Sequence, residues 1–330
     1  MKSQAEVWQM IKQHIKKEWK AAFFATFIIG LLIHMPMMLQ DIPNHDGLDS
    51  MHFDQNMITS GRWFLTMACG ISSYFTLPWL IGLLAILYLA LTSVALVEFL
   101  EVRKTSVIIL ISGLLAGFPA IASTFAYVFT MDGYMMALFL AVLSVVLTKK
   151  YKFGFAAGAV CLACSMGIYQ AYLPFAVILC IYGILMIAMG NGELKEKILC
   201  SLRYLYMGIA GASGYYVILQ ILLKIQGKEL ASYQGIDGMG AVERSGIFEI
   251  LVKMYTDFIA FTLKGNVLVN NMFSLAAVCG LVLVAAVTLI QLMIHRKWWR
   301  SIWLYGLLVL LVIGLPIATN IILIVSPELL

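Results

Sequence analysis

Two carboxylates, a histidine and an arginine stand close together early in the sequence, within Asn44-His45-Asp46-Gly47-Leu48-Asp49 and Gly61-Arg62-Trp63. A carboxylate in such a position can take the proton of a hydroxyl group as a general base. The guanidinium of Arg62 suits a phosphate, because its planar fork can donate two parallel hydrogen bonds. The stretch therefore combines groups that can activate a hydroxyl with a group that can stabilise a phosphate.

Four aspartates fall in the polar segment 41–75: Asp41, Asp46, Asp49 and Asp54. Solvation alone would explain carboxylates in an aqueous loop. This segment follows directly on an apolar run, however, so its carboxylates are expected at a membrane surface. They could also bind a divalent cation, which would need further oxygen ligands. The sequence predicts no other cofactor.

The rest of the chain must hold these groups at a membrane. Of its 330 residues, 62% are hydrophobic and 12% are charged, and the mean hydropathy is +0.94. A soluble domain would carry about 25% charged residues, so this chain must use lipid as its solvent. Its long, continuous apolar runs predict an all-α polytopic membrane protein rather than a β-barrel. The net charge of +5 is then explained by basic loops at the membrane, not by nucleic-acid binding.

We expect an amphipathic helix over residues 1–20, lying on the inner membrane surface, and a transmembrane domain over residues 21–330. Pro174, just after Tyr169-Gln170-Ala171-Tyr172, should split the apolar run 153–190 into a hairpin. The longest polar segment, 225–268, should form a second outer loop. About nine spans are predicted, near 21–40, 76–98, 105–129, 133–148, 153–190 (two spans), 202–224, 271–294 and 301–325.

The positions of the basic residues predict the orientation of these spans. Sixteen of the 22 lysines and arginines fall in the loops on the side of the N-terminus, and six fall on the other side. Cytoplasmic loops carry the excess of basic residues. The sequence therefore predicts a multi-pass protein of the plasma (inner) membrane with a cytoplasmic N-terminus, and it places segment 41–75 on the extracytoplasmic side.

Three more polar side chains are predicted at the outer ends of spans. Asp132 stands between the third and fourth spans, where a carboxylate either faces a polar cavity or caps the following helix. Tyr169 and Gln170 stand at the turn between the fifth and sixth spans. They could bind substrate, or serve as an interfacial aromatic and a helix–helix hydrogen bond. His45 is a weaker candidate for substrate binding.

Five short elements appear in chain order: Asn44-His45-Asp46, Ser60-Gly61-Arg62-Trp63, Asp132-Gly133-Tyr134-Met135-Met136-Ala137, Ser165-Met166-Gly167-Ile168-Tyr169-Gln170-Ala171-Tyr172 and Pro316-Ile317-Ala318-Thr319-Asn320. Together they resemble the bacterial membrane glucosyltransferases that decorate O-antigen and related surface glycans, the Gtr type II group of the GT-C class. The resemblance covers residues 20–325, approximately. This family tends to have a paired Asp where His45-Asp46 stands here, so Asp46 alone carries over as the catalytic carboxylate.

The resemblance implies transfer of a hexose, glucose, from a polyprenyl-phosphate donor such as undecaprenyl-phosphate glucose. The acceptor would be a surface glycan or another cell-envelope polymer on the extracytoplasmic face. Asp46 would activate the acceptor hydroxyl, and Asp49 and Asp132 would position the sugar or the acceptor. Arg62 would hold the departing phosphate, whose charge grows as the bond breaks. The substrate-binding residues would be His45, Asp49, Arg62, Asp132, Tyr169 and Gln170.

The family has further spans, so the resemblance also implies that this chain is truncated at its C-terminus or is a short relative. The main alternative function is a transporter or flippase of a lipid-linked or small substrate, and a third is a non-catalytic assembly subunit. A transporter should have ionisable groups near the bilayer midplane and interrupted helices at repeat-related positions. Here the charges stand at the ends of the spans, which favours the transferase.

Overall fold

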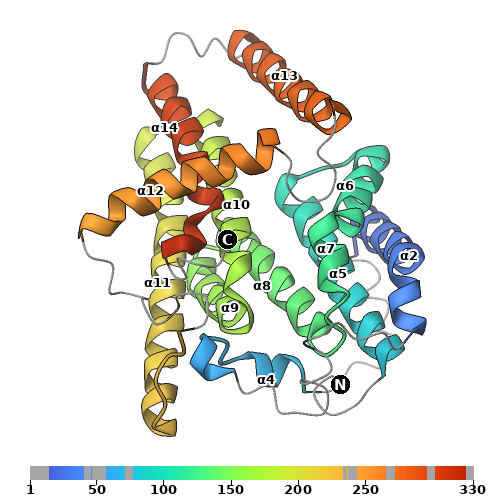
Figure 1. The fold of residues 1–330 in the computed structure, drawn as a ribbon. Helices are drawn as coiled ribbons and strands as arrows, with labels where there is room; N and C mark the ends of the chain where they lie inside the picture. Colours follow the sequence, from blue (N-terminus) through green and yellow to red (C-terminus); the bar gives the residue numbers. More distant parts are fainter. Residues whose placement is uncertain are drawn as a thin grey trace, which may run out of the picture. The chain divides into compact units, whose positions relative to one another are not determined.

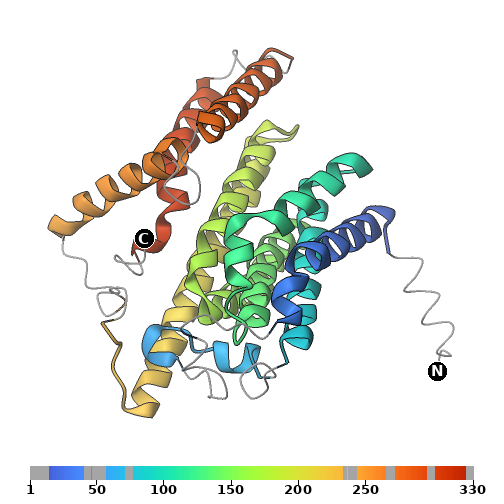
Figure 2. The ribbon, with the colours of Figure 1, turned by 45° about the vertical axis from the view of Figure 1, so that its right-hand side comes forward.

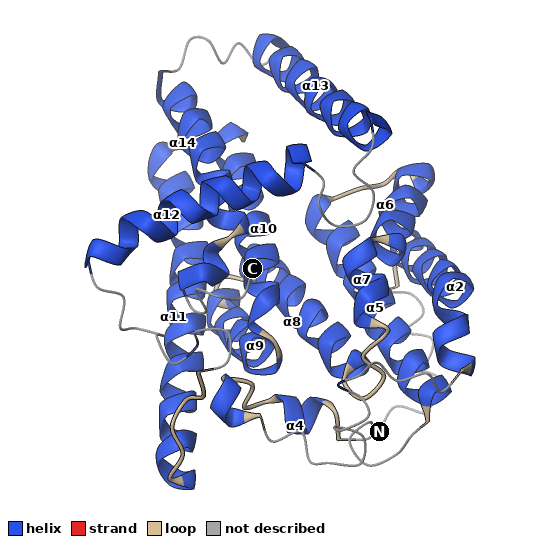
Figure 3. Ribbon diagram, viewed as in Figure 1, coloured by secondary structure: helices blue, strands red, loops and turns tan. Residues whose placement is uncertain are grey.

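The computed structural model describes residues 15–40, 46, 57–70, 77–232, 236, 244–264, 272–295 and 302–324. Within these ranges every regular element is a helix (Figure 3), apart from an isolated antiparallel bridge between Met57 and Arg62. The chain divides into two compact units. The first comprises Met1–Tyr172 with Arg203–Glu229, and the second Leu173–Leu202 with Leu230–Leu330.

In the first unit, α8 (Met131–Lys150) packs between α5 (Pro78–Leu100) and α9 (Gly154–Ile168), as Figures 1 and 2 show. Helix α2 (Lys17–Leu39) packs against α5, and α6 (Thr105–Gly117) packs against α2. The long helix α11 (Leu194–Gln226) meets α9 where Gly211 approaches Leu162.

Six helices are long and apolar enough to cross a membrane, and three shorter apolar helices accompany them among the described residues. Large hydrophobic side chains such as Leu32, Leu114 and Ile221 are exposed on their outer faces. In a membrane a helix satisfies all of its own backbone hydrogen bonds, while lipid covers its apolar surface. The all-α polytopic membrane fold that the composition predicts is thus confirmed. The amphipathic helix predicted over 1–20 stays a prediction, because residues 1–14 lie outside the described ranges.

The third predicted span, 105–129, is not one continuous helix. Helix α6 ends at Gly117, and a separate short helix, α7 (Pro119–Thr124), begins after Phe118. Pro119 has no backbone N–H and disfavours helical geometry at Phe118, which accounts for the break. The helix of the fourth predicted span, 133–148, begins slightly earlier, because α8 already starts at Met131 and includes Asp132.

The apolar run 153–190 is divided into two helices, as predicted, and Tyr169 and Gln170 stand at the break between them. Helix α9 ends at Ile168, a single 3₁₀ turn, η2 (Gln170–Tyr172), follows, and α10 (Leu173–Met189) begins with Pro174 in its first turn. Proline is well tolerated in a first helical turn, where its missing N–H would have had no partner.

The second unit contains α10, α12 (Arg244–Ile259), α13 (Met272–His295) and α14 (Ile302–Thr319), with the short turns η4 (Ala260–Lys264) and η6 (Ile321–Ile324). Two hydrogen bonds join α12 to the end of α14. The Tyr255 hydroxyl donates to the Ile313 carbonyl at 2.6 Å, and the Asn320 amide donates to the Met254 carbonyl at 2.9 Å. The late Pro-x-Ala-x-Asn element, 316–320, therefore ties two helices of this unit together.

Two glycines make a matched test of how closely the helices of the first unit pack. A Cβ added at Gly158 of α9 would lie 2.5 Å from the Ser144 carbonyl oxygen of α8, whereas one added at Gly208 of α11 meets nothing within 4 Å. We predict that Gly158→Ala lowers the melting temperature in detergent by roughly 3–10 °C, because the contact is with backbone that cannot rotate away. Gly208→Ala should leave it unchanged or slightly higher, since alanine favours helix. Equal effects of the two substitutions would contradict this packing.

Candidate functional site

A tight turn over residues 57–62 presents Arg62. The amide of Gly61 donates to the Ile58 carbonyl at 2.9 Å, and the amide of Arg62 returns to the Met57 carbonyl at 3.0 Å. Gly61 has a φ of 76°, in the left-handed region that glycine adopts without a steric penalty. The Ser60 hydroxyl also donates to the Met57 carbonyl, at 2.9 Å. The turn is therefore fixed by its own backbone, which explains the Ser-Gly-Arg order.

The side chain of Arg62 is 8% exposed and lies among aromatic residues. Its Nη1 donates to the Tyr134 hydroxyl at 3.3 Å, and its guanidinium carbon lies 4.9 Å from the centre of the Tyr169 ring. The Tyr134 and Tyr169 rings stack on each other with centroids 4.6 Å apart. A cation over an aromatic face is stabilised by the ring's quadrupole. Residues from α8 and from the α9–α10 turn thus hold the guanidinium in place.

Gln170 connects this turn to a third segment. Its side-chain amide donates to the Ser60 carbonyl at 3.1 Å and to the Tyr215 hydroxyl of α11 at 2.9 Å. Gln170 is 6% exposed and Tyr215 is 1% exposed. Buried polar groups need hydrogen-bond partners, and the bond between the Gln170 amide and the Tyr215 hydroxyl supplies one to each side chain. The amide therefore joins the arginine turn, the α9–α10 turn and α11.

The segment after Arg62 packs directly on the end of α9. The amide of Phe64 donates to the Gly167 carbonyl at 2.7 Å. A Cβ at Gly167 would lie 2.6 Å from the Trp63 ring, so only glycine lets the indole approach. Further along, α4 (Leu65–Ala68) is followed by Cys69, whose sulfur occupies the space that a Cβ at Gly133 would need. Gly133 of α8 and Gly167 of α9 thus leave the space that the segment 63–69 needs to pack against these helices.

Asp132 lies close to this cluster but on another side of α8. It is 2% exposed and occupies the first turn of the helix, where the partial positive charge of the helix N-terminus stabilises a carboxylate. Its Oδ1 accepts a hydrogen bond from the Gly133 amide at 2.9 Å. Residues two apart on a helix point in different directions, so the side chains of Asp132 and Tyr134 diverge. The residue at the N-cap position is Thr130, not Asp132.

Of the four aspartates in segment 41–75, the structure describes Asp46, which is exposed. His45 and Asp49 lie outside the described residues, as do Asp41 and Asp54. The role of Asp46 and the divalent cation that this loop could hold therefore stay predictions. Of the predicted site residues, the structure brings together Arg62, Tyr169 and Gln170, and it places Asp132 beside them at the same end of α8.

Sequence reasoning missed two tyrosines of this cluster. Tyr134 was part of the Asp132-Gly133-Tyr134 element, but its hydroxyl was not singled out as a partner of Arg62. Tyr215 stands inside an apolar run, next to Tyr216. A phenol that is buried within a span needs a hydrogen-bond partner, and that need is the signal that could have indicated Tyr215.

Comparison with known families identifies the protein class. The family model described as glucosyl transferase GtrII matches residues 35–329. The chain belongs to the GtrII glucosyltransferase family. No curated protein and no solved structure matched. The matched region begins near the C-terminal end of α2 and continues past α14, so it includes most of both units.

The Gln170 amide offers a direct test of the site. We predict that Gln170→Leu reduces glucosyl transfer at least tenfold and lowers the melting temperature. It leaves the Ser60 carbonyl and the Tyr215 hydroxyl buried without their shared donor, at a cost of about 1–3 kcal/mol for each. Tyr215→Phe, which removes one of these two bonds, should have a smaller effect. For each variant, the transfer rate and the melting temperature in detergent should be measured.

Gln220→Leu is the matched control, because Gln220 lies on α11 with an exposed side chain. It should behave as wild type in both measurements. If Gln170→Leu matched Gln220→Leu, the amide would not organise the site.

Proposed function

We propose that this GtrII protein transfers glucose from a polyprenyl-phosphate donor to a surface glycan on the extracytoplasmic side of the plasma membrane. The observation that supports this most directly is the convergence of Arg62, Tyr169 and Gln170 at the Met131 end of α8. Lys149 and Lys150 stand at the opposite end of the same helix. Since basic residues favour the cytoplasmic side, the Met131 end and its cluster would face outward.

A lipid-linked donor suits a site at the end of a membrane helix. The polyprenyl chain would remain in the bilayer beside the exposed apolar faces of the spans, and its phosphate would reach the membrane surface. Arg62 would pair with that phosphate, and the stacked Tyr134 and Tyr169 rings would hold the guanidinium in a fixed direction. Such preorganised charge stabilises the negative charge that develops as the glycosidic bond to phosphate breaks.

The chemistry then needs one base and one leaving group. The acceptor hydroxyl attacks the anomeric carbon, Asp46 takes its proton, and the bond between that carbon and the phosphate oxygen breaks. The exposed Asp46 would be accessible to a bulky glycan acceptor. Asp132 and Asp49, with His45, would position the sugar or the acceptor. The phosphate leaves as the polyprenyl phosphate.

The donor can be identified with purified protein in liposomes. We expect label to pass from polyprenyl-phosphate [¹⁴C]glucose to the acceptor glycan and none to pass from a nucleotide-linked glucose. A parallel arm with a chelator tests the divalent cation: loss of transfer there would assign a metal to the outer-loop carboxylates. Transfer from the nucleotide sugar instead would overturn the proposed donor. Movement of the lipid-linked sugar across the bilayer without bond formation would favour the transporter.

The base is tested by Asp46→Asn, which keeps the shape of the side chain and removes its proton affinity. We predict a fall in transfer rate of about 10²–10⁴-fold, the usual contribution of a general base, with unchanged expression and melting temperature. Glu229→Gln, a change of an exposed carboxylate at the end of the first unit, should retain full activity. A wild-type rate for Asp46→Asn would remove this residue from the mechanism.

A further inference from the structure

A second polar cluster lies in the first unit at the Lys150 end of α8. Because a 20-residue helix is about 30 Å long, this cluster is remote from Arg62. It encloses a cavity of about 210 Å³, lined by charged residues of α2, α5 and α8 and of the α5–α6 turn. One water occupies roughly 30 Å³ in the liquid, so the space suffices for a small headgroup. The charged residues of the lining are Glu18, Glu98, Glu101, Arg103, Lys149 and Lys150.

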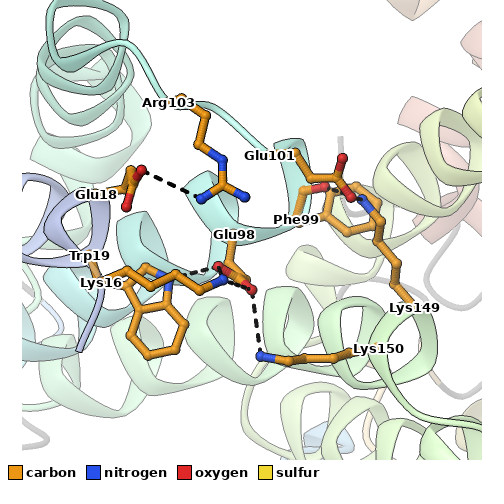
Figure 4. Close-up of polar contacts among 9 residues, drawn as sticks. All are labelled: Lys16, Glu18, Trp19, Glu98, Phe99, Glu101, Arg103, Lys149 and Lys150. Atoms are coloured by element: carbon orange, nitrogen blue, oxygen red, sulfur yellow. Dashed lines mark hydrogen bonds and ion pairs between the residues drawn. The ribbon is translucent and has the colours of Figure 1, made fainter. Parts of the chain in front are cut away.

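Two of the carboxylates in this cavity already have strong partners. Glu98 accepts hydrogen bonds from Lys16 at 2.6 and 2.7 Å and from the Trp19 indole at 2.7 Å, as Figure 4 shows. Glu101 pairs with Lys149 at 2.9 Å, and Lys149 also donates to the Phe99 carbonyl at 2.7 Å. These contacts neutralise the two carboxylates and hold them in place.

The remaining cations are held much less tightly. Among the described residues, Arg103 donates one hydrogen bond, 3.4 Å long, to Glu18, although a guanidinium has five N–H groups. Lys150 contacts Glu98 at 3.5 Å, beyond the usual length of a charge-assisted bond. The side chains of Arg103 and Lys150 are 66% and 43% exposed. The cavity therefore has donor capacity to spare on its positive groups, which suits an anion.

The surroundings of the cavity match a lipid. Its apolar wall contains Val97, Val102 and Val146. Helix α6 starts two residues after Arg103 and exposes Leu110 and Leu114 on its surface. A headgroup in the cavity could thus continue into acyl chains along an apolar helix face.

We propose that this cavity binds the phosphate of an anionic phospholipid through Arg103 and Lys150. The glycerol would rest on the valine wall, and the acyl chains would follow α6. This binding site is separate from the sugar-transfer site, and the proposal does not depend on the donor or on the base. Its ligand chemistry, a phosphate ester, could also come from a soluble compound, so the test includes both sources.

The test is native mass spectrometry of the full chain after delipidation, with phosphatidylglycerol, phosphatidylcholine or inorganic phosphate added. We expect a preference for phosphatidylglycerol over phosphatidylcholine. The double variant Arg103→Gln/Lys150→Gln should bind phosphatidylglycerol at least about tenfold more weakly, because it loses charge-assisted hydrogen bonds. The control Lys104→Gln/Lys152→Gln removes the same charge from exposed residues outside the lining, and its affinity should stay within about twofold of wild type.

A third variant, Glu18→Gln, is expected to raise the affinity for phosphatidylglycerol rather than lower it. It removes the carboxylate that competes for Arg103, so it should strengthen phosphatidylglycerol binding, and this gain cannot result from misfolding. Equal losses in the two double variants would show a general effect of surface charge and overturn the proposal. So would the absence of any preference for the anionic lipid. Binding of inorganic phosphate through Arg103 and Lys150, without that preference, would assign the cavity to a soluble phosphate compound instead.

Discussion

The Gln170 side chain supplies the hydrogen bonds on which the arrangement of the candidate site depends. A membrane helix satisfies its own backbone, but wherever the chain leaves the helix its polar groups need other partners. The first unit leaves the helix at the turn of residues 57–62 and again between α9 and α10. Gln170 stands at the second break and donates to the Ser60 carbonyl of the first. One amide thus joins two breaks that are 110 residues apart in the sequence, and its second bond, to Tyr215, anchors both to α11.

This joint requires the segments to approach closely, and small residues make the approach possible. At Gly167 the Trp63 ring lies where a side chain would stand, and at Gly133 the Cys69 sulfur does so. Interfaces between membrane helices rely on such contacts, because lipid gives no hydrophobic driving force between them. The same device that packs α9 on α8 at Gly158 therefore also admits the loop that carries Arg62. Packing and site geometry have one physical origin in this protein.

The sequence predicted those features that local composition determines. Apolar runs and their basic flanks predicted the membrane fold and the approximate spans, and Pro174 with the preceding Tyr169-Gln170 pair predicted the break within 153–190. Breaks within a run were harder. The break at Pro119 was not predicted, because the residues around this proline are apolar. For the site, residue types indicated Arg62, Tyr169 and Gln170, but not Tyr134 or Tyr215, whose roles depend on contacts between distant segments.

Arg62 shows why burial and reactivity must be considered together. An arginine that is 8% exposed has lost most of its hydration, so its charge needs compensation from neighbouring groups. Tyr134 and Tyr169 provide a hydroxyl oxygen and an aromatic face, which stabilise the cation without adding a negative charge of their own. The hydroxyl oxygen of Tyr134 and the ring of Tyr169 also fix the direction of the guanidinium. Its desolvation is therefore completed during folding rather than when a phosphate approaches, which is the preorganisation that favours stabilisation of a developing negative charge.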